Sequence, residues 1–204
     1  MRAIATYAVM GALASMAVGA RVSAASPIAL TIRVYNTSGV PAPELLSARR
    51  AVESTFRDTG LDLTFRHCGR PVSPEDPIDP CGESLKPREV VVRVIDAPAF
   101  NPNLHPEAYG VAYLVKETDR GWLATVFSDR IGAAAARVGV EAGTLLGLVM
   151  AHEVAHLLLG IGYHGEAGVM RADWPDTLLN HAAGQWRFSM LEAARLRQAA
   201  SIPF

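Results

Sequence analysis

Two histidines four residues apart, with a glutamate beside the first, open the stretch HEVAHLLLGIGYHGEAGVM at residues 152–170. On an α-helix, residues i and i+4 share one face, so His152 and His156 can each direct a ring nitrogen at a single metal ion. Glu153 lies beside that face and can reach a metal-bound water without binding the metal itself. The pattern therefore predicts a Zn²⁺ site with Glu153 as the general base.

A third protein ligand is needed, because catalytic zinc takes three side chains and keeps its fourth position for water. His164 is the first candidate, since Gly160 can cap the helix in a left-handed conformation and Gly162 can help the chain turn back beneath it. Glu192 is an alternative, although it also fits a solvated position on a C-terminal helix. His181 is the other alternative, and it also fits a loop position or a partner of a ligand.

The plainer interpretation of residues 141–160 is a buried helix whose two histidines are hydrogen-bonded core residues. This segment is the most apolar after the N-terminal leader and ends at a glycine. Three ionisable groups on such a helix are costly to bury without partners. A zinc ion would satisfy both histidines and orient the glutamate, and we therefore favour the metal site.

The order HExxH, glycine, histidine, methionine resembles the active-site motif of the metzincin clan of zinc endopeptidases. The match runs from His152 to Met170. The resemblance implies that Met170 lies in a tight turn, the Met-turn, and forms an apolar floor under the metal. It implies an α/β (α+β) catalytic domain with a twisted mixed sheet, an antiparallel edge strand that pairs with the substrate, an active-site helix and a C-terminal helix. It also implies hydrolysis of peptide or protein substrates.

The spacing departs from the clan pattern. The usual motif is HExxHxxGxxH, whereas this chain has HExxHxxxGxxxH. Some branches have a tyrosine two residues after the methionine that stabilises the transition state, and Ala172 stands there in this chain. Tyr109, Tyr163 and Arg171 are the candidates for that role. The alternative function is a secreted zinc-containing binding protein of the same fold that does not cleave peptides.

Elements that could position this motif follow from hydrophobic periodicity. Segments 28–36 and 61–68 alternate apolar and polar residues and predict strands, and segment 89–98 is mostly apolar and predicts a central strand. Between the first two, segment 43–60 begins with proline, ends with glycine and has apolar residues every three or four positions, which predicts an amphipathic helix. This strand–helix–strand order predicts a right-handed crossover and a mixed sheet.

The second half of the chain continues the pattern. Segments 109–116 and 122–129 are joined by a short polar turn and predict an antiparallel hairpin, with 109–116 in the place of the edge strand. Residues 130–139 fit a loop or a short helical piece. A C-terminal helix is expected around 186–200.

Composition and the N-terminus suggest an exported globular protein. The chain has 204 residues, of which 50% are hydrophobic and 19% charged, and it contains no basic run of the kind that binds nucleic acid. Residues 1–24 have a basic start, an apolar middle and the small-residue sequence Val-Ser-Ala, which is typical of a signal peptide; a membrane anchor is the alternative. Cleavage after Ala24 would take the net charge from −1 to −3. We expect residues 25–204 to form a single catalytic domain in the periplasm or the medium, with no stable membrane insertion.

Cys68 and Cys81 are the two cysteines of the chain. In an exported protein such a pair predicts a disulfide, which would close a proline-rich loop and stabilise the fold by about 3 kcal/mol. The alternative, two ligands of a separate metal site, lacks the close Cys-x-x-Cys pairing of such sites.

Overall fold

The computed structural model describes residues 26–69, 81–98, 104–160, 162–179 and 186–202. The expected signal peptide, most of the proline-rich loop and His181 therefore lie outside the described residues. Within them, one hydrophobic core extends between the sheet and the helices.

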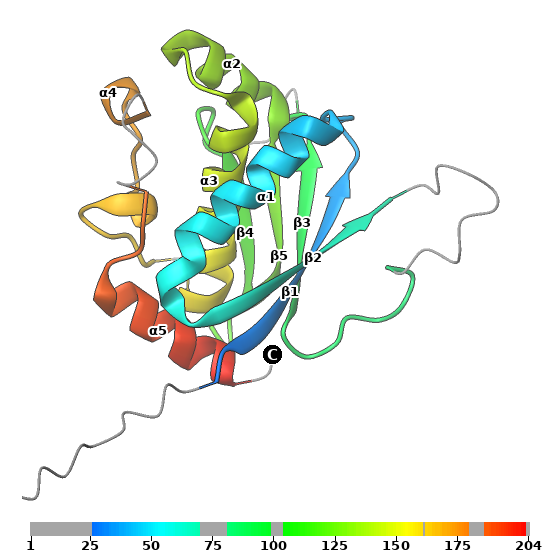
Figure 1. Cartoon of the computed structure of the whole chain (residues 1–204), viewed down its shortest axis with the longest axis vertical. Helices are drawn as coiled ribbons and strands as arrows, with labels where there is room; N and C mark the ends of the chain where they lie inside the picture. The colour runs from blue at the N-terminus through cyan, green and yellow to red at the C-terminus, as the bar shows by residue number, and fades with distance from the viewer. Residues whose placement is uncertain (1–25, 70–80, 99–103, 161, 180–185, 203–204) are drawn as a thin grey trace, which may run out of the picture.

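Five strands form one sheet in the order β2-β1-β3-β5-β4 (Figure 1). They are β1 (Ile28–Asn36), β2 (Leu61–Cys68), β3 (Glu89–Ile95), β4 (Gly110–Val115) and β5 (Arg120–Phe127). The pairs β1–β2, β1–β3 and β3–β5 are parallel, and β4 is antiparallel to β5 at the edge. The mixed sheet, the central third strand and the antiparallel edge strand are therefore confirmed.

The helices follow the expected order. They are α1 (Ala42–Phe56), continued by the 3₁₀ turn η1 (Arg57–Thr59), then α2 (Ser128–Val138), α3 (Ala142–Leu159), the 3₁₀ turn η2 (Gly168–Met170), α4 (Asp176–Leu179) and α5 (Met190–Ser201). Within segment 130–139, expected as a loop or a short helical piece, residues 130–138 belong to a regular 11-residue helix, α2. This helix ends at Gly139, whose φ of 74° lets its N–H bond the carbonyl of Ala135 at 2.9 Å.

Helix α3 is the core helix that carries the candidate site. It packs on α1, on β4 and on β5. A Cβ on Gly143 or Gly147 would overlap the backbone carbonyls of Glu44 and Ala48, so glycine permits the close crossing of α1 and α3. Among the described residues, α3 is also the one helix apolar enough to cross a membrane, but 78% of it is buried inside the molecule. It is therefore the buried helix that the sequence indicates.

The opposite face of the sheet contains a buried arginine. Arg33 of β1 is 1% exposed and forms an ion pair with Glu89. It also donates to the carbonyls of Glu83 at 2.8 Å and Ser84 at 3.2 Å. The predicted disulfide joins Cys68 to Cys81 just before these two residues. The arginine and the disulfide together hold the segment leading to β3 against the sheet.

Replacing Glu89 by glutamine is expected to lower the free energy of unfolding by about 3–5 kcal/mol, because Arg33 would stay buried without its charge partner. Burial opposes ionisation of Glu89, but the Lys86 N–H and the Arg33 guanidinium more than offset it and hold the pKa of this carboxyl below its usual value. The ion pair therefore stabilises the fold fully above the unfolded-state pKa of about 4.3. That stabilisation is lost as the pH falls through the lower folded-state pKa.

Urea unfolding at a series of pH values measures this effect. Glu53→Gln is the matched control, since its ion pair with Arg49 is 40–44% exposed and is worth about 1 kcal/mol at most. Equal losses of stability in the two variants would contradict the assignment.

Candidate metal centre

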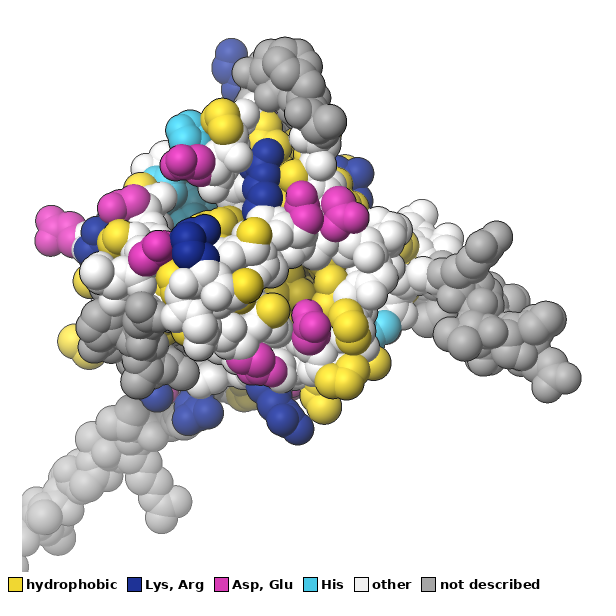
Figure 2. All heavy atoms as spheres, turned by 90° about the horizontal axis from the view of Figure 1, so that it is seen from above, with side chains coloured by type: hydrophobic (Ala, Val, Ile, Leu, Met, Phe, Trp, Pro, Cys, Tyr) yellow, Lys and Arg dark blue, Asp and Glu magenta, His cyan; other side chains and the backbone are white. Residues whose placement is uncertain are grey.

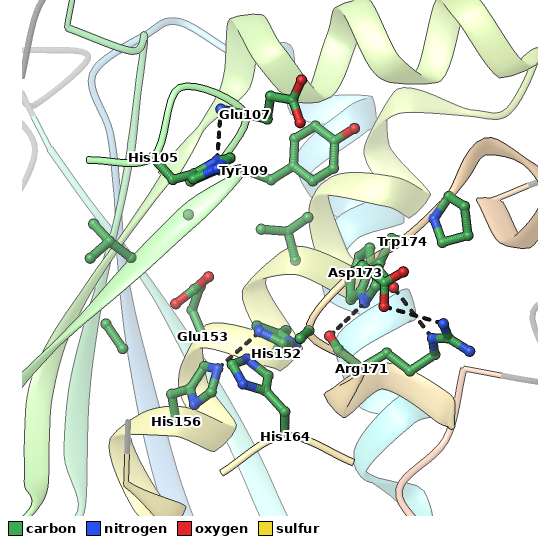
Figure 3. Close-up of a pocket in the computed structure, with 17 residues that line it drawn as sticks. His105, Glu107, Tyr109, His152, Glu153, His156, His164, Arg171, Asp173 and Trp174 are labelled. Carbon is green, nitrogen blue, oxygen red and sulfur yellow. Dashed lines mark hydrogen bonds and ion pairs between the residues drawn. The ribbon is translucent and has the colours of Figure 1, made fainter. Parts of the chain in front are cut away.

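Three histidine rings converge at the C-terminal end of α3 (Figure 3). His152 and His156 lie one turn apart on the helix, and His164 comes from the loop that follows. One potential ligand nitrogen from each ring lies within 4.8 Å of the other two. His164 is exposed, but its ring centroid is 4.8 Å from that of His156 and 5.6 Å from that of His152. The structure thus brings together the three histidines that the sequence singles out.

Hydrogen bonds fix the orientation of the two helix histidines. The Nδ1 of His152 lies 2.7 Å from the carbonyl oxygen of Val169, and the Nδ1 of His156 lies 3.2 Å from that of Gly160. A carbonyl oxygen only accepts hydrogen bonds, so each Nδ1 carries a hydrogen and each neutral ring leaves its Nε2 with a free lone pair. This is the tautomer in which histidine offers Nε2 to a metal, and a carbonyl on the other nitrogen is the usual orienting partner.

The two Nε2 atoms face each other 2.9 Å apart. Two lone pairs at this distance repel, and a cation between them removes the repulsion. Ligand nitrogens of a tetrahedral zinc ion lie about 3.3 Å apart, given zinc–nitrogen bonds of about 2.0–2.1 Å. Three imidazole nitrogens are a donor set that suits zinc. The residues present therefore fit a bound zinc ion, and His152, His156 and His164 are the ones that would hold it.

The loop that carries His164 begins at Gly160. This residue has a φ of 96° and a ψ of 158°, a conformation open to glycine but outside the left-handed helical region expected for it. Its N–H bonds the carbonyl of His156 at 2.9 Å while its own carbonyl orients the His156 ring. Gly162 follows Ile161, which lies outside the described residues, so its part in the turn stays a prediction. The loop closes with a bond from the Gly165 N–H to the carbonyl of Met170 at 2.7 Å.

Met170 lies in η2 and is fully buried in the core. The neighbouring Val169 provides the carbonyl that orients His152. The turn therefore supports the candidate site through its backbone. The floor role of the Met170 side chain stays a prediction from the resemblance.

Burial dominates the electrostatics of the candidate site. It raises the pKa of Glu153 to about 8. Burial, together with the neighbouring histidines, lowers the pKa of His152 to about 4, and burial lowers the pKa of His156. Both helix histidines are therefore neutral at pH 7, which is the state that binds metal. A divalent cation beside Glu153 would favour its carboxylate form.

Glu192 is buried, whereas the sequence favoured a solvated position for it on the C-terminal helix. It is 2% exposed and forms a capping box at the start of α5, in which its carboxylate accepts from the Ser189 N–H at 2.7 Å. Its Oε1 also lies against Gly165, where an added Cβ would come within 2.5 Å. The solvated interpretation was therefore wrong, since Glu192 packs under the loop that carries His164. Among the described residues it is not part of the histidine cluster.

Two of the three candidates for transition-state stabilisation are engaged with other side chains, and the third lies across the cavity from the histidines. Tyr163 packs its ring 5.2 Å from the Arg195 guanidinium. Arg171 is paired with Asp173 at 3.2 Å and bonds the Glu166 carbonyl at 3.4 Å. Tyr109 lines the cavity, but Figure 3 shows it across from the histidines, next to Glu107.

A cavity of about 640 Å³ opens in front of the histidines, between α3, β4 and residues 171–175. Figure 2 shows histidine side chains close together at the upper left of the face seen from above, among acidic and basic side chains, with histidine also visible at the right of that face. Trp174 forms part of the cavity wall, with its ring 5.5 Å from that of His152 and 4.7 Å from that of Trp186. Gly110 of β4 also lines the cavity. Neither Trp174 nor Gly110 stands out in the sequence, because their contacts at the cavity come from distant segments.

The comparisons with known proteins agree with this architecture. The structure is similar to that of an archaemetzincin from Methanopyrus kandleri, with a TM-score of 0.54 over 85% of this chain and 96% of that chain, at 14% sequence identity. No protein-family model matches the sequence, and no curated protein matches it. The likeness shows that the chain has an archaemetzincin-like fold, a mixed five-stranded sheet with packed helices.

Proposed function

We propose that this protein is an exported zinc-dependent endopeptidase. The observation that carries the proposal is the pair of facing Nε2 atoms of His152 and His156, 2.9 Å apart, with both Nδ1 atoms bound to carbonyls. His164 supplies the third nitrogen. The disulfide between Cys68 and Cys81 is compatible with export and supports that part of the proposal.

The chain's own residues divide the chemistry between them. When bound, zinc lowers the pKa of a coordinated water to about 7 and polarises the substrate carbonyl. Glu153 takes the proton from the attacking water and passes it to the leaving amine. Its position beside the histidines and its buried surroundings suit this role. No described residue hydrogen-bonds its carboxyl, which is therefore free to exchange a proton with the reacting groups.

The edge strand favours a peptide as the substrate. Strand β4 ends the sheet order, and its residues Gly110, Val111 and Ala112 line the cavity in front of the histidines. An edge strand presents unpaired N–H and C=O groups that an extended peptide can bond as an added strand. A peptide held in this way would pass the histidines with its backbone exposed to attack.

Cleavage of a mixed peptide library by the purified protein tests the proposal. We expect fragments that vanish when a chelator removes zinc and return when zinc is restored. The fragments are read by mass spectrometry, and zinc per chain is measured on the same samples. Cleavage that persists in the zinc-free protein would contradict the proposed mechanism.

A zinc-containing binding protein without peptidase activity is the second candidate. It is favoured by Ala172, which stands where a tyrosine would act, and by the engagement of Tyr163 with Arg195 and of Arg171 with Asp173. One zinc per chain, with no fragments from the library, would identify this alternative.

A further inference from the structure

Gly110, the first residue of β4, lies directly against the Glu153 side chain. A Cβ built on Gly110 would lie 2.7 Å from Oε1, 2.8 Å from Cγ and 2.9 Å from Cδ of Glu153. Real Cβ atoms almost never make contacts under 3.0 Å, so the Glu153 side chain would have to shift. The Glu153 carboxyl therefore occupies the space that any other residue at position 110 would fill.

The backbone of β4 does not itself require glycine at this position. Gly110 is absent from the residues with positive φ, and it pairs with Val126 of β5 as an ordinary strand residue. Its missing side chain is thus explained by the contact with Glu153, since an alanine would be compatible with the strand.

Packing holds the Glu153 carboxyl in place. Glu153 is 6% exposed, and this burial raises the pKa of its carboxyl. Within the described part of the chain no hydrogen bond or ion pair orients it. Figure 3 shows the carboxyl beside His152 and His156, on the sheet side of the helix. With no polar partner to fix it, its position follows from the walls around it, and Gly110 is one of those walls.

We propose that Gly110 is a positioning residue that lets the Glu153 carboxyl lie between the edge strand and the paired histidines. The inference rests on the proposed function, because Glu153 matters there as the general base. A side chain at position 110 displaces the carboxyl and leaves the three histidines where they are. The smallest such side chain, alanine, is therefore sufficient to separate zinc binding from turnover.

The first experiment compares Gly110→Ala with Gly132→Ala in the zinc-loaded protein. Gly132 lies on α2, and a Cβ there would meet no atom within 4 Å, so it is the matched control. We expect Gly110→Ala to keep one zinc per chain and to lower kcat by about 10–100-fold with little change in KM, since a displacement of about 1 Å can cost about 100-fold. Gly132→Ala should keep the zinc content and the kcat of the unaltered protein. Unchanged kcat in Gly110→Ala would overturn the inference.

A second experiment needs no catalysis. Thermal unfolding of the zinc-free protein is measured for Gly110→Ala with either Glu or Ala at position 153. Because Glu153 must leave its preferred rotamer when Gly110 is replaced, Tm should fall about 2–5 °C further with Glu than with Ala. The effect of alanine on the unfolded chain is the same in both backgrounds and cancels. The same pair of measurements with Gly132→Ala should give no difference.

The two experiments test the role of Gly110 separately from the proposed peptidase function. An equal change of Tm in both backgrounds would overturn the role of Gly110, whether or not any peptide is cleaved. A Tm difference of the expected size in a protein that cleaves no peptide would support the contact and overturn only the proposed peptidase function.

Discussion

Glu153→Gln is expected to give a folded, zinc-loaded protein whose kcat/KM for peptide cleavage falls by about 10²–10⁴-fold, the usual contribution of a general base. Glutamine has the shape of glutamate but cannot accept the proton of the attacking water. Burial raises the pKa of Glu153 to about 8, so a neutral side chain suits this position and the fold should tolerate the change. Cleavage rates and zinc per chain are measured on the same preparation.

Glu107→Gln is the matched control for this variant. Its carboxyl is exposed and lines the same cavity, and Figure 3 shows it across from the histidines. We expect its cleavage rate to stay close to that of the unaltered protein. Equal zinc content with undiminished cleavage in Glu153→Gln would refute the assignment of Glu153 as the base.

His156→Ala is expected to abolish stable zinc binding and all chelator-sensitive cleavage. The variant loses a buried, oriented nitrogen, and one of three donors is removed. Loss of an outer-shell partner already costs about 10–100-fold in metal affinity, and loss of a direct ligand should cost more than about 100-fold. Zinc affinity is measured by competition with a chelator of known strength.

Two further variants complete this measurement. His105→Ala removes an exposed histidine that lines the cavity outside the histidine cluster, and it should keep the affinity of the unaltered protein. His164→Ala tests the third ligand and should also lose zinc. Undiminished zinc affinity in His164→Ala would mean that another side chain is the third ligand, and would contradict the proposed ligand set.

Local patterns in the sequence were sufficient to predict most of the strands of the sheet. The predicted strands at 28–36 and 61–68 have the observed bounds, because a sheet with one apolar and one polar face imposes strict alternation. The predicted third strand runs from residue 89 to residue 98, whereas β3 ends at Ile95. The predicted fifth strand, 122–129, runs past the end of β5, because Ser128 and Asp129 already belong to α2. There the Ser128 hydroxyl donates a hydrogen bond to Asp96 at 2.9 Å. These errors arise where the chain leaves the sheet through side-chain contacts between distant segments.

In the candidate site, too, local spacing could be interpreted from the sequence and long-range packing could not. The helix histidines and Glu153 could be found from spacing alone, because a helix fixes their relative positions. The convergence of His164 could be inferred because a glycine follows the helix end. The buried cap formed by Glu192 and the contact between Gly110 and Glu153 depend on packing between segments far apart in the chain, and no local pattern encodes them.

The close crossing of α1 and α3 at Gly143 and Gly147 affects how metal could enter and leave. Backbone amides in such a tightly packed helix exchange their hydrogens with solvent only when the whole fold opens. We therefore expect His152 and His156, which follow this crossing on the same helix, to lie in a slowly opening part of the fold, whereas His164 is exposed on a loop. Solvent, and a metal ion with it, therefore reaches the three histidines from the side of His164.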